Sequence, residues 1–235
     1  MSLRSGGVSI APWDSLNLSF SVGDDPAAVA QNRARYVQAI GARPVWLKLV
    51  HGTQVLRLHT ATEDHPATPA DAAWTTDRGV ACTVDAADCL PVLFALRDGR
   101  AVGAAHAGWR GLAAGVLEAT LQAMCQGTGA QPAAVQAWLG PCIGAQNFEV
   151  GSDVLQAFAV QPGDGLAAYF RPRPRADGQM RWLADLAGLA RQRLGAAGVQ
   201  LISGSSACTV QDASSFFSFR RGGVTGRMAA SIWRT

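Results

Sequence analysis

The sequence of 235 residues is poor in histidine, charge and long apolar runs. Its four histidines are far fewer than the imidazole array of a cupredoxin-type multicopper oxidase, so one small metal site is the most it can build. Charged residues make up 16%, below the usual share of about 25%, which argues against disorder and against a coiled coil. No stretch approaches the roughly 18 uninterrupted apolar residues of a membrane-spanning helix. We therefore expect a globular protein with no membrane partner.

The cysteines do not follow the spacing of a disulfide-bonded or zinc-finger domain. The five cysteines are odd in number, irregularly spaced and without a C-x-x-C pair, which makes a disulfide or zinc-finger scaffold a poor fit. The segment from Met1 to Phe20 lacks the basic start and apolar run of a signal peptide. The sequence predicts a cytoplasmic protein with reduced thiols. The cysteines are Cys82, Cys89, Cys125, Cys142 and Cys208.

Lysine is nearly absent, and the positive charge is spread thinly. The formal net charge is +3, and Lys48 is the only lysine among 20 basic residues. The densest basic group lies between Arg171 and Arg181, among prolines and glycine and without interleaved aromatic residues. Base stacking needs such aromatics, so we expect a solvated extended loop and no nucleic-acid partner. Since no heptad pattern is visible either, we expect a monomer.

Helical and strand patterns mix along the chain, which predicts one mixed α/β (α+β) domain over residues 1–235. The first helix is well marked, because Asp25 is a suitable N-cap and Pro26 suits the first helical position. Asp98-Gly99 separates two apolar runs and predicts an antiparallel hairpin. Helices are predicted at 27–40, 111–126, 152–160 and 182–197, a loop at 61–70 and a turn at 161–165. Strands are predicted at 45–50, 55–59, 80–84, 90–96, 101–105, 135–139, 199–203, 215–220 and 228–233.

Three strand ends carry polar residues, the usual place for active sites in such folds. His51 follows one apolar strand, while Cys89 and His106 flank the predicted hairpin. Antiparallel pairing brings the two hairpin ends side by side, within reach of one ion. Two imidazoles and a thiolate are a zinc ligand set that keeps a position open for water or substrate. Taken alone, His51 could be a packed histidine and Cys89 a buried, unreactive thiol. The sequence also does not guarantee that His51 lies beside the other two.

The segment after His106 is a glycine-rich turn that bears Arg110. Backbone N–H groups at the start of the following helix, together with Arg110, could form an anion site. The alternative is that Gly108 and Gly111 only let the chain turn. Asp85 and Asp88 are candidates for a general acid or base, and equally for orienting a ligating histidine.

These residues carry a resemblance to the laccase-domain (YfiH-like) family, whose members were labelled multicopper polyphenol oxidases and later described as purine nucleoside phosphorylases. The matching stretches run in order through the whole chain, and the one that begins at His106 is highly specific. Leu49 departs from the glutamine that the family usually has before its Val-His-Gly. The principal matches are Val50-His51-Gly52, Asp88-Cys89-Leu90-Pro91, His106-Ala107-Gly108-Trp109-Arg110-Gly111, Leu139-Gly140-Pro141-Cys142-Ile143, Phe217-Ser218-Phe219-Arg220-Arg221 and Thr225-Gly226-Arg227-Met228.

The resemblance implies a single-domain αββα sandwich with mixed β-sheets. It implies metal binding by His51, Cys89 and His106, the set that the residues themselves suggest. The implied metal is zinc, with copper as an alternative. The implied reactions are phosphorolysis of adenosine, inosine and methylthioadenosine, and deamination of adenosine. The zinc-deaminase signature, H-x-E with P-C-x-x-C, is missing from this sequence, so deamination would use a different constellation.

Three other functions stay open at this point. Cys89 could be a nucleophile with His106 as its base, giving a hydrolase or amidase. Similarity to the fold of Cys–His deamidase toxins, and the family's link to peptidoglycan-precursor editing, suit that reading. A single copper in the same site could give slow phenol oxidation. The site could also be structural in a metal-binding protein that is not an enzyme.

Overall fold

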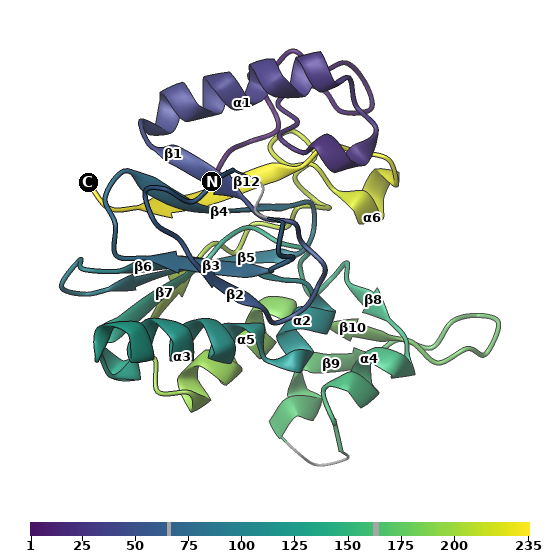
Figure 1. Ribbon diagram of the computed structural model, residues 1–235. Helices are drawn as coiled ribbons and strands as arrows, with labels where there is room; N and C mark the ends of the chain where they lie inside the picture. The colour runs from purple at the N-terminus through teal and green to yellow at the C-terminus, as the bar shows by residue number, and fades with distance from the viewer. Residues whose placement is uncertain (65–66, 162–164) are drawn as a thin grey trace.

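The computed structural model describes residues 1–64, 67–161 and 165–235, and stacks them in four layers (Figure 1). Helix α1 (Pro26–Ile40) lies on a three-stranded sheet, which packs on a six-stranded sheet. Helices α2 (Trp109–Ala114), α3 (Val116–Thr128) and α5 (Leu186–Ala196) cover the far face of the larger sheet. The predicted αββα sandwich with mixed sheets is therefore confirmed. His65, in the predicted loop at 61–70, and most of the predicted turn at 161–165 lie outside the described residues.

The smaller sheet has the order β1-β4-β12, with β1 (Arg43–Trp46) parallel to β4 (Val80–Ala86) and β12 (Met228–Trp233) antiparallel to it. The prediction of a strand at 45–50 was wrong in its bounds, because β1 ends at Trp46. Beyond that residue the backbone no longer pairs with β4, and the N–H of Val50 donates to the Asp71 carboxylate instead. The chain thus leaves the sheet before His51.

The larger sheet has the order β11-β7-β5-β6-β3-β2. The hairpin at Asp98-Gly99 is confirmed, since β5 pairs antiparallel with β6 and sets Pro91 opposite His106. Strand β3 was not predicted; it pairs antiparallel with β6 and parallel with β2. The strands are β2 (Val55–Arg57), β3 (Ala72–Thr75), β5 (Leu90–Leu96), β6 (Val102–Ala107), β7 (Val135–Leu139) and β11 (Leu201–Gly204).

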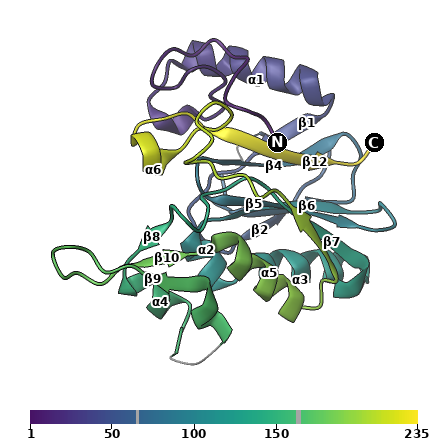
Figure 2. The ribbon, with the colours of Figure 1, turned by 180° about the vertical axis from the view of Figure 1, so that it is seen from behind.

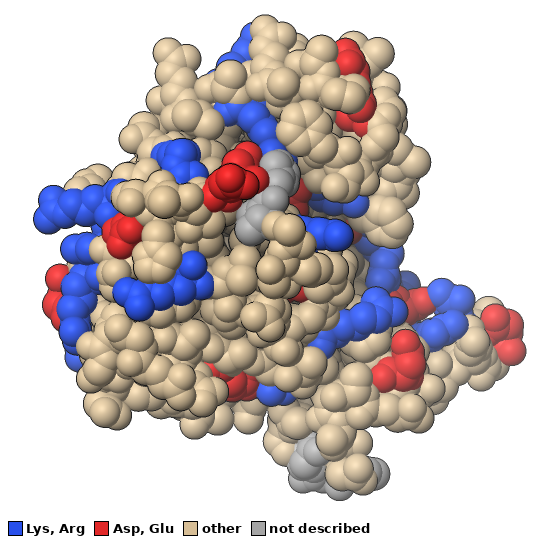
Figure 3. Space-filling view, in the orientation of Figure 1, with Lys and Arg blue, Asp and Glu red and all other residues tan. Residues whose placement is uncertain are grey.

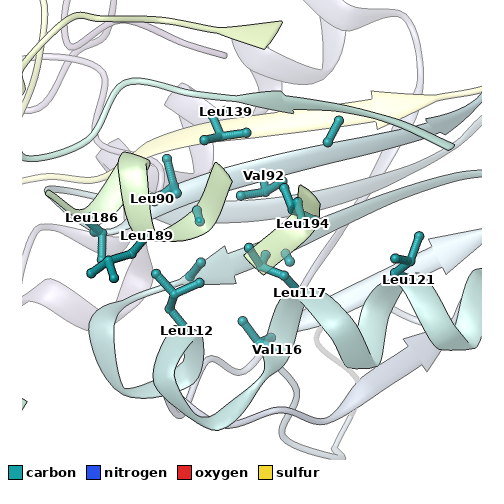
Figure 4. Close-up of a cluster of buried hydrophobic side chains, with 14 of the residues drawn as sticks. Leu90, Val92, Leu112, Val116, Leu117, Leu121, Leu139, Leu186, Leu189 and Leu194 are labelled. Carbon is teal, nitrogen blue, oxygen red and sulfur yellow. The ribbon is translucent and has the colours of Figure 1, made fainter. Parts of the chain in front are cut away.

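The main core lies between the six-stranded sheet and its helices, where leucines of the sheet meet leucines of the helices (Figure 4). A separate apolar cluster joins the two sheets and includes Val45, Cys82 and Ala104. Cys82, Val84 and their neighbours on β4 face this inter-sheet cluster. Because side chains alternate along a strand, Thr83 and Asp85 face the α1 layer instead.

Three predicted elements were wrong in form. The helix predicted at 111–126 is two helices, because Gly115 adopts φ +100 and ends α2 before α3 begins. The segment predicted as one helix from Trp182 begins as strand β10 (Trp182–Ala184); Asp185 then caps α5 by accepting from the Gly188 N–H. The segment 215–220 is not a strand, and its end enters the short helix α6 (Phe219–Gly222).

A third, small sheet has the order β8-β10-β9 and carries a projecting hairpin, which Figure 2 shows from behind. Its other strands are β8 (Glu149–Val150) and β9 (Phe170–Pro172), and helix α4 (Ser152–Ala157) lies beside it. The arginines between Arg171 and Arg181 lie on this hairpin and are largely exposed, as the solvated-loop prediction requires. Over the described ranges, every helix is too short or too polar to cross a membrane.

Candidate active site

His51 lies in the loop between β1 and β2, on a turn organised by one buried carboxylate. The N–H groups of Val50, His51 and Gly52 donate to the carboxylate of Asp71, at 3.1, 2.9 and 2.7 Å. Three consecutive donors converge on one group only if the backbone curls tightly, and His51 has φ +60, in the left-handed region. Asp71 itself is fully buried. The loop thus holds the exposed imidazole of His51 in a fixed position.

Cys89 lies where the chain crosses from the smaller sheet, after β4, to the larger sheet, at β5. Its neighbour Asp88 fixes this crossing: its carboxylate accepts from the Thr209 hydroxyl and from the Arg220 N–H, each at 2.6 Å. Asp88 has φ +94, and its carbonyl accepts from the Ile143 N–H at 2.9 Å. Because both carboxylate oxygens are engaged in this way, Asp88 positions the backbone of Cys89 and does not orient a histidine.

His106 lies near the end of β6 and is buried. Its Nδ1 donates to the Asp71 carboxylate at 2.9 Å, and its backbone N–H donates to the Asp71 carbonyl at 2.7 Å. With Nδ1 engaged, Nε2 is the atom left for the cluster, an arrangement common for metal-bound histidines. The imidazoles of His51 and His106 meet edge to face, with 4.8 Å between ring centroids.

The donor atoms of His51, Cys89 and His106 all lie within 4.8 Å of one another, and Cys89 Sγ is 3.8 Å from His51 Nε2. Tetrahedral zinc with bonds of about 2.0–2.3 Å needs donors roughly 3.3–3.6 Å apart, so small side-chain rotations suffice. Gly108 leaves the space open, because a Cβ there would lie 2.7 Å from His51 Cδ2 and 3.0 Å from Cys89 Sγ. Thiolate and imidazole donors suit zinc or copper. The residues therefore fit a small mononuclear site.

Charge coupling in the cluster favours an ion pair. Burial alone would raise the pKa of Cys89, but the neighbouring His106 and His51 lower it to about 6. Burial would likewise lower the pKa of His106, but the Cys89 thiolate and Asp71 raise it to about 10. Burial also opposes ionisation of Asp71, yet its hydrogen bonds to His106 and to the loop N–H groups lower its pKa. For Cys142, burial and then the nearby Asp185 raise the pKa to about 12.

The cluster opens into a cavity of about 980 Å³. One wall comes from 19–22, α1, β1 and the segment 219–227, and the opposite wall from Trp109, Arg110 and residues of 143–186. Five basic side chains line the cavity against two acidic ones, so it suits an anionic ligand. In Figure 3 basic side chains gather along the notch between the α1 side of the molecule and the projecting hairpin. The basic residues are Arg33, Lys48, Arg110, Arg220 and Arg227, and the acidic ones are Asp85 and Asp88.

Arg110 lies at the cavity with its guanidinium 4.2 Å from the centre of the Trp109 ring, and it is exposed. Arg110 lies in the first turn of α2, which has only six residues and is shorter than predicted, so the helix dipole adds less to an anion site than expected. His59 is exposed, and its Nδ1 lies 3.8 Å from the Asp77 carboxylate, away from the cluster.

Sequence reasoning missed Asp71, the residue that ties the histidines together. It directly precedes the unpredicted strand β3, whose residues Ala72–Thr75 are all buried. An acidic residue at the edge of a short apolar run was the available signal.

Comparison with known proteins gives a consistent result over the whole length. A purine nucleoside phosphorylase of Pseudomonas aeruginosa is 47% identical over 230 residues, which cover 98% of this chain and 90% of that protein. The purine nucleoside phosphorylase YfiH of Escherichia coli is 46% identical, with 99% and 91% covered. The crystal structure of a Neisseria meningitidis protein matches with a TM-score of 0.90 at 46% identity, with 99% of this chain and 91% of that one covered.

The family profile described as "Multi-copper polyphenol oxidoreductase laccase" matches residues 1–235. The relatives and the solved structure above agree with that match over nearly the whole chain. The chain belongs to the multi-copper polyphenol oxidoreductase laccase family.

Proposed function

We propose that this chain is a metal-dependent purine nucleoside phosphorylase acting on adenosine, inosine and methylthioadenosine. The observation that carries the proposal is the cluster of His51, Cys89 and His106 at the base of a large cavity with a mainly basic lining. Relatives named as purine nucleoside phosphorylases, at 47% and 46% identity, support the same reaction. We expect the protein to act as a monomer in the cytoplasm, without nucleic-acid or membrane partners.

The metal would be held by His51 Nε2, Cys89 Sγ and His106 Nε2, and zinc is our choice because it favours three protein ligands with one open position. When bound, zinc supplies a Lewis acid that stabilises developing negative charge. Asp71 holds His106 through Nδ1 and so fixes which ring nitrogen faces the site. Copper is the alternative metal, because thiolate and imidazole also bind copper.

Phosphate would bind beside Arg110, with Lys48 and Arg220 supplying further positive charge at the cavity. In the reaction a phosphate oxygen forms a bond to C1′ of the ribose, and the bond between C1′ and N9 breaks. The electron pair of that bond goes to the purine, which takes up a proton on leaving. Guanidinium groups that hold the phosphate oxygens in place orient this attack.

The test is release of free adenine from adenosine with and without phosphate. We expect release only with phosphate, together with stoichiometric zinc in the protein. Cys89→Ala should lose both. Cys125→Ala is the matched control, because Cys125 is half-buried on α3 and does not line the cavity. Undiminished adenine release by Cys89→Ala would overturn the proposal. Bound zinc with no turnover of any nucleoside would favour a metal-binding protein that is not an enzyme.

Deamination of adenosine, which we also propose for this site, consumes water and releases ammonia and inosine. It needs no phosphate, so ammonia release in phosphate-free buffer separates it from phosphorolysis. Loss of both activities in Cys89→Ala would place them at one site. Deamination that survives in Cys89→Ala would show that it is not a reaction of this cluster.

A second function is favoured by one specific arrangement. His106 lies between Cys89 and Asp71, and the lowered pKa of Cys89 provides a thiolate near neutral pH, as in a cysteine hydrolase or amidase. Such an enzyme could act in peptidoglycan-precursor editing. Alkylation of Cys89 in metal-free protein, followed by return of zinc, separates the schemes. Amidase activity that needs the free thiol and no metal would establish the hydrolase.

A copper-dependent phenol oxidase is the remaining alternative, and the family description favours it. In the described ranges, His51, Cys89 and His106 form the one group of three such ligands. That leaves room for a single copper and for slow oxidation at most. Oxidation of a phenol by copper-loaded protein at a rate above that of free copper would support it.

A further inference from the structure

Asp85 lies on β4 at the cavity, four residues before Cys89. It is half-buried and faces the α1 layer, away from the inter-sheet core. In the ranges that the structure describes, no hydrogen bond or ion pair engages its carboxylate. Asp71 and Asp88, by contrast, use both carboxylate oxygens within the protein. Asp85 is thus a carboxylate at the cavity whose acceptor capacity is open to a ligand.

The surroundings of Asp85 link it to the metal cluster. Burial lowers the pKa of Arg227, while Asp85, Cys89 and Asp88 oppose that shift. The guanidinium of Arg227 is therefore close enough to interact electrostatically with both Asp85 and Cys89. Four residues of chain span at most about 14 Å, which limits the separation of Asp85 from Cys89. A ligand bound at the cluster can therefore extend to Asp85.

We propose that Asp85 binds the 2′ and 3′ hydroxyl groups of the ribose, an inference that rests on the proposed nucleoside phosphorylase function. An ionised carboxylate accepts hydrogen bonds and donates none. Adenosine carries an amino donor at C6 where inosine carries a carbonyl acceptor, so a carboxylate facing C6 would repel inosine. Methylthioadenosine lacks the 5′ hydroxyl. The vicinal diol is the donor pair that all three nucleosides share.

The same placement assists the reaction. As the bond between C1′ and N9 breaks, positive charge develops on the sugar, and a hydrogen bond from the 2′ hydroxyl to a carboxylate strengthens with it. Glycoside hydrolases gain from comparable contacts to the 2-hydroxyl group. Asp85 therefore contributes both to binding of ribonucleosides and to their preference over deoxyribonucleosides.

The experiment compares adenosine with 2′-deoxyadenosine in wild type and in Asp85→Asn. We expect kcat/KM for adenosine to fall about 10- to 100-fold in the variant, the range for a lost hydrogen bond to a charged group. The value for 2′-deoxyadenosine should fall less, because this substrate has only the 3′ hydroxyl to lose its contact, so the preference for the ribonucleoside should shrink. Asp98→Asn, in the exposed β5–β6 turn, is the matched control and should behave as wild type. Thermal unfolding checks that Asp85→Asn folds.

Equal loss on both nucleosides would overturn the proposal, since it would mean a structural role. A change in the preference between adenosine and inosine, with the preference for ribose intact, would also overturn it and move Asp85 to the base. If there is no turnover, nucleoside binding can still be measured directly through the fluorescence of Trp46 and Trp109, which line the cavity. If wild type binds adenosine without phosphorolysis, the proposed function fails while the binding ratio still tests Asp85. If it binds neither nucleoside, both proposals fail.

Discussion

Replacing Asp71 by asparagine tests how the site is held together. The carboxylate accepts four hydrogen bonds, three from N–H groups of the loop at His51 and one from His106 Nδ1. An amide keeps one accepting oxygen and turns an NH₂ group toward the other two donors. Each buried donor without an acceptor costs about 1–3 kcal/mol. The variant should therefore lose about 2–6 kcal/mol, a large part of a typical folding free energy of about 5–15 kcal/mol.

Two measurements check this prediction. Urea unfolding of metal-free protein gives the loss of stability, and competition with a chromophoric chelator gives zinc affinity, which should fall about 10- to 100-fold. Asp77→Asn is the control: Asp77 accepts from the Thr60 N–H at the exposed end of β3, and asparagine can still accept there. Wild-type stability with wild-type affinity in Asp71→Asn would refute the reasoning. Lost stability with unchanged affinity would show that Asp71 ties the loop without orienting His106.

The pH dependence of stability follows from the same carboxylate. The pKa of Asp71 is lower in the folded protein than in the unfolded chain. Its contribution is therefore fully present above the unfolded value of about 3.9 and is lost as the pH falls through the folded value. Acid unfolding of wild type should begin at lower pH than acid unfolding of Asp71→Asn.

Three further predictions concern the cluster and the core. Gly108→Ala should abolish zinc binding and leave the far-ultraviolet circular dichroism unchanged, because the new Cβ would lie against two ligands, whereas Gly195→Ala meets open space and should bind zinc normally. In metal-free protein, alkylation of Cys89 by iodoacetamide should rise through pH 6 and level off near neutrality, since the thiolate forms above its pKa of about 6, while Cys142 stays unreactive; a rise near pH 9 would contradict the ion pair. Leu117→Ala, at a fully buried core position, should cost about 2–5 kcal/mol in urea unfolding, and a loss well under 1 kcal/mol would contradict the packing.

The sequence predicts the candidate cluster better than it predicts the elements around it. Cys89 and His106 flank a hairpin whose turn, Asp98-Gly99, has a strong local signal, so their proximity follows from local rules. His51 joins them through Asp71, a contact between segments 20 residues apart in sequence that no local pattern encodes. Its φ of +60 is held by that contact, because residues other than glycine only rarely adopt the left-handed region.

The errors in secondary structure have local causes. Trp182–Ala184 continues the apolar spacing of α5, so periodicity alone merges a strand with a helix, although Asp185 marks the true start by its cap. Gly115 lies within an apolar pattern that fits one helix, and only its left-handed backbone separates α2 from α3. β3 is four residues long and fully buried, too short for alternation to reveal it.

The cavity is assembled from parts of the chain that can diverge separately. The candidate ligands and Asp71 come from residues 51–106, whereas one wall comes from 19–22 and 219–227, near the two ends of the sequence. Substitutions in those end segments would reshape the space around a ligand without touching the cluster or the carboxylate that holds it. Descendants of one ancestor could thus acquire different substrate preferences while keeping the same metal chemistry. The substrate of an individual relative would then depend on the residues of this wall, and not on the three metal ligands.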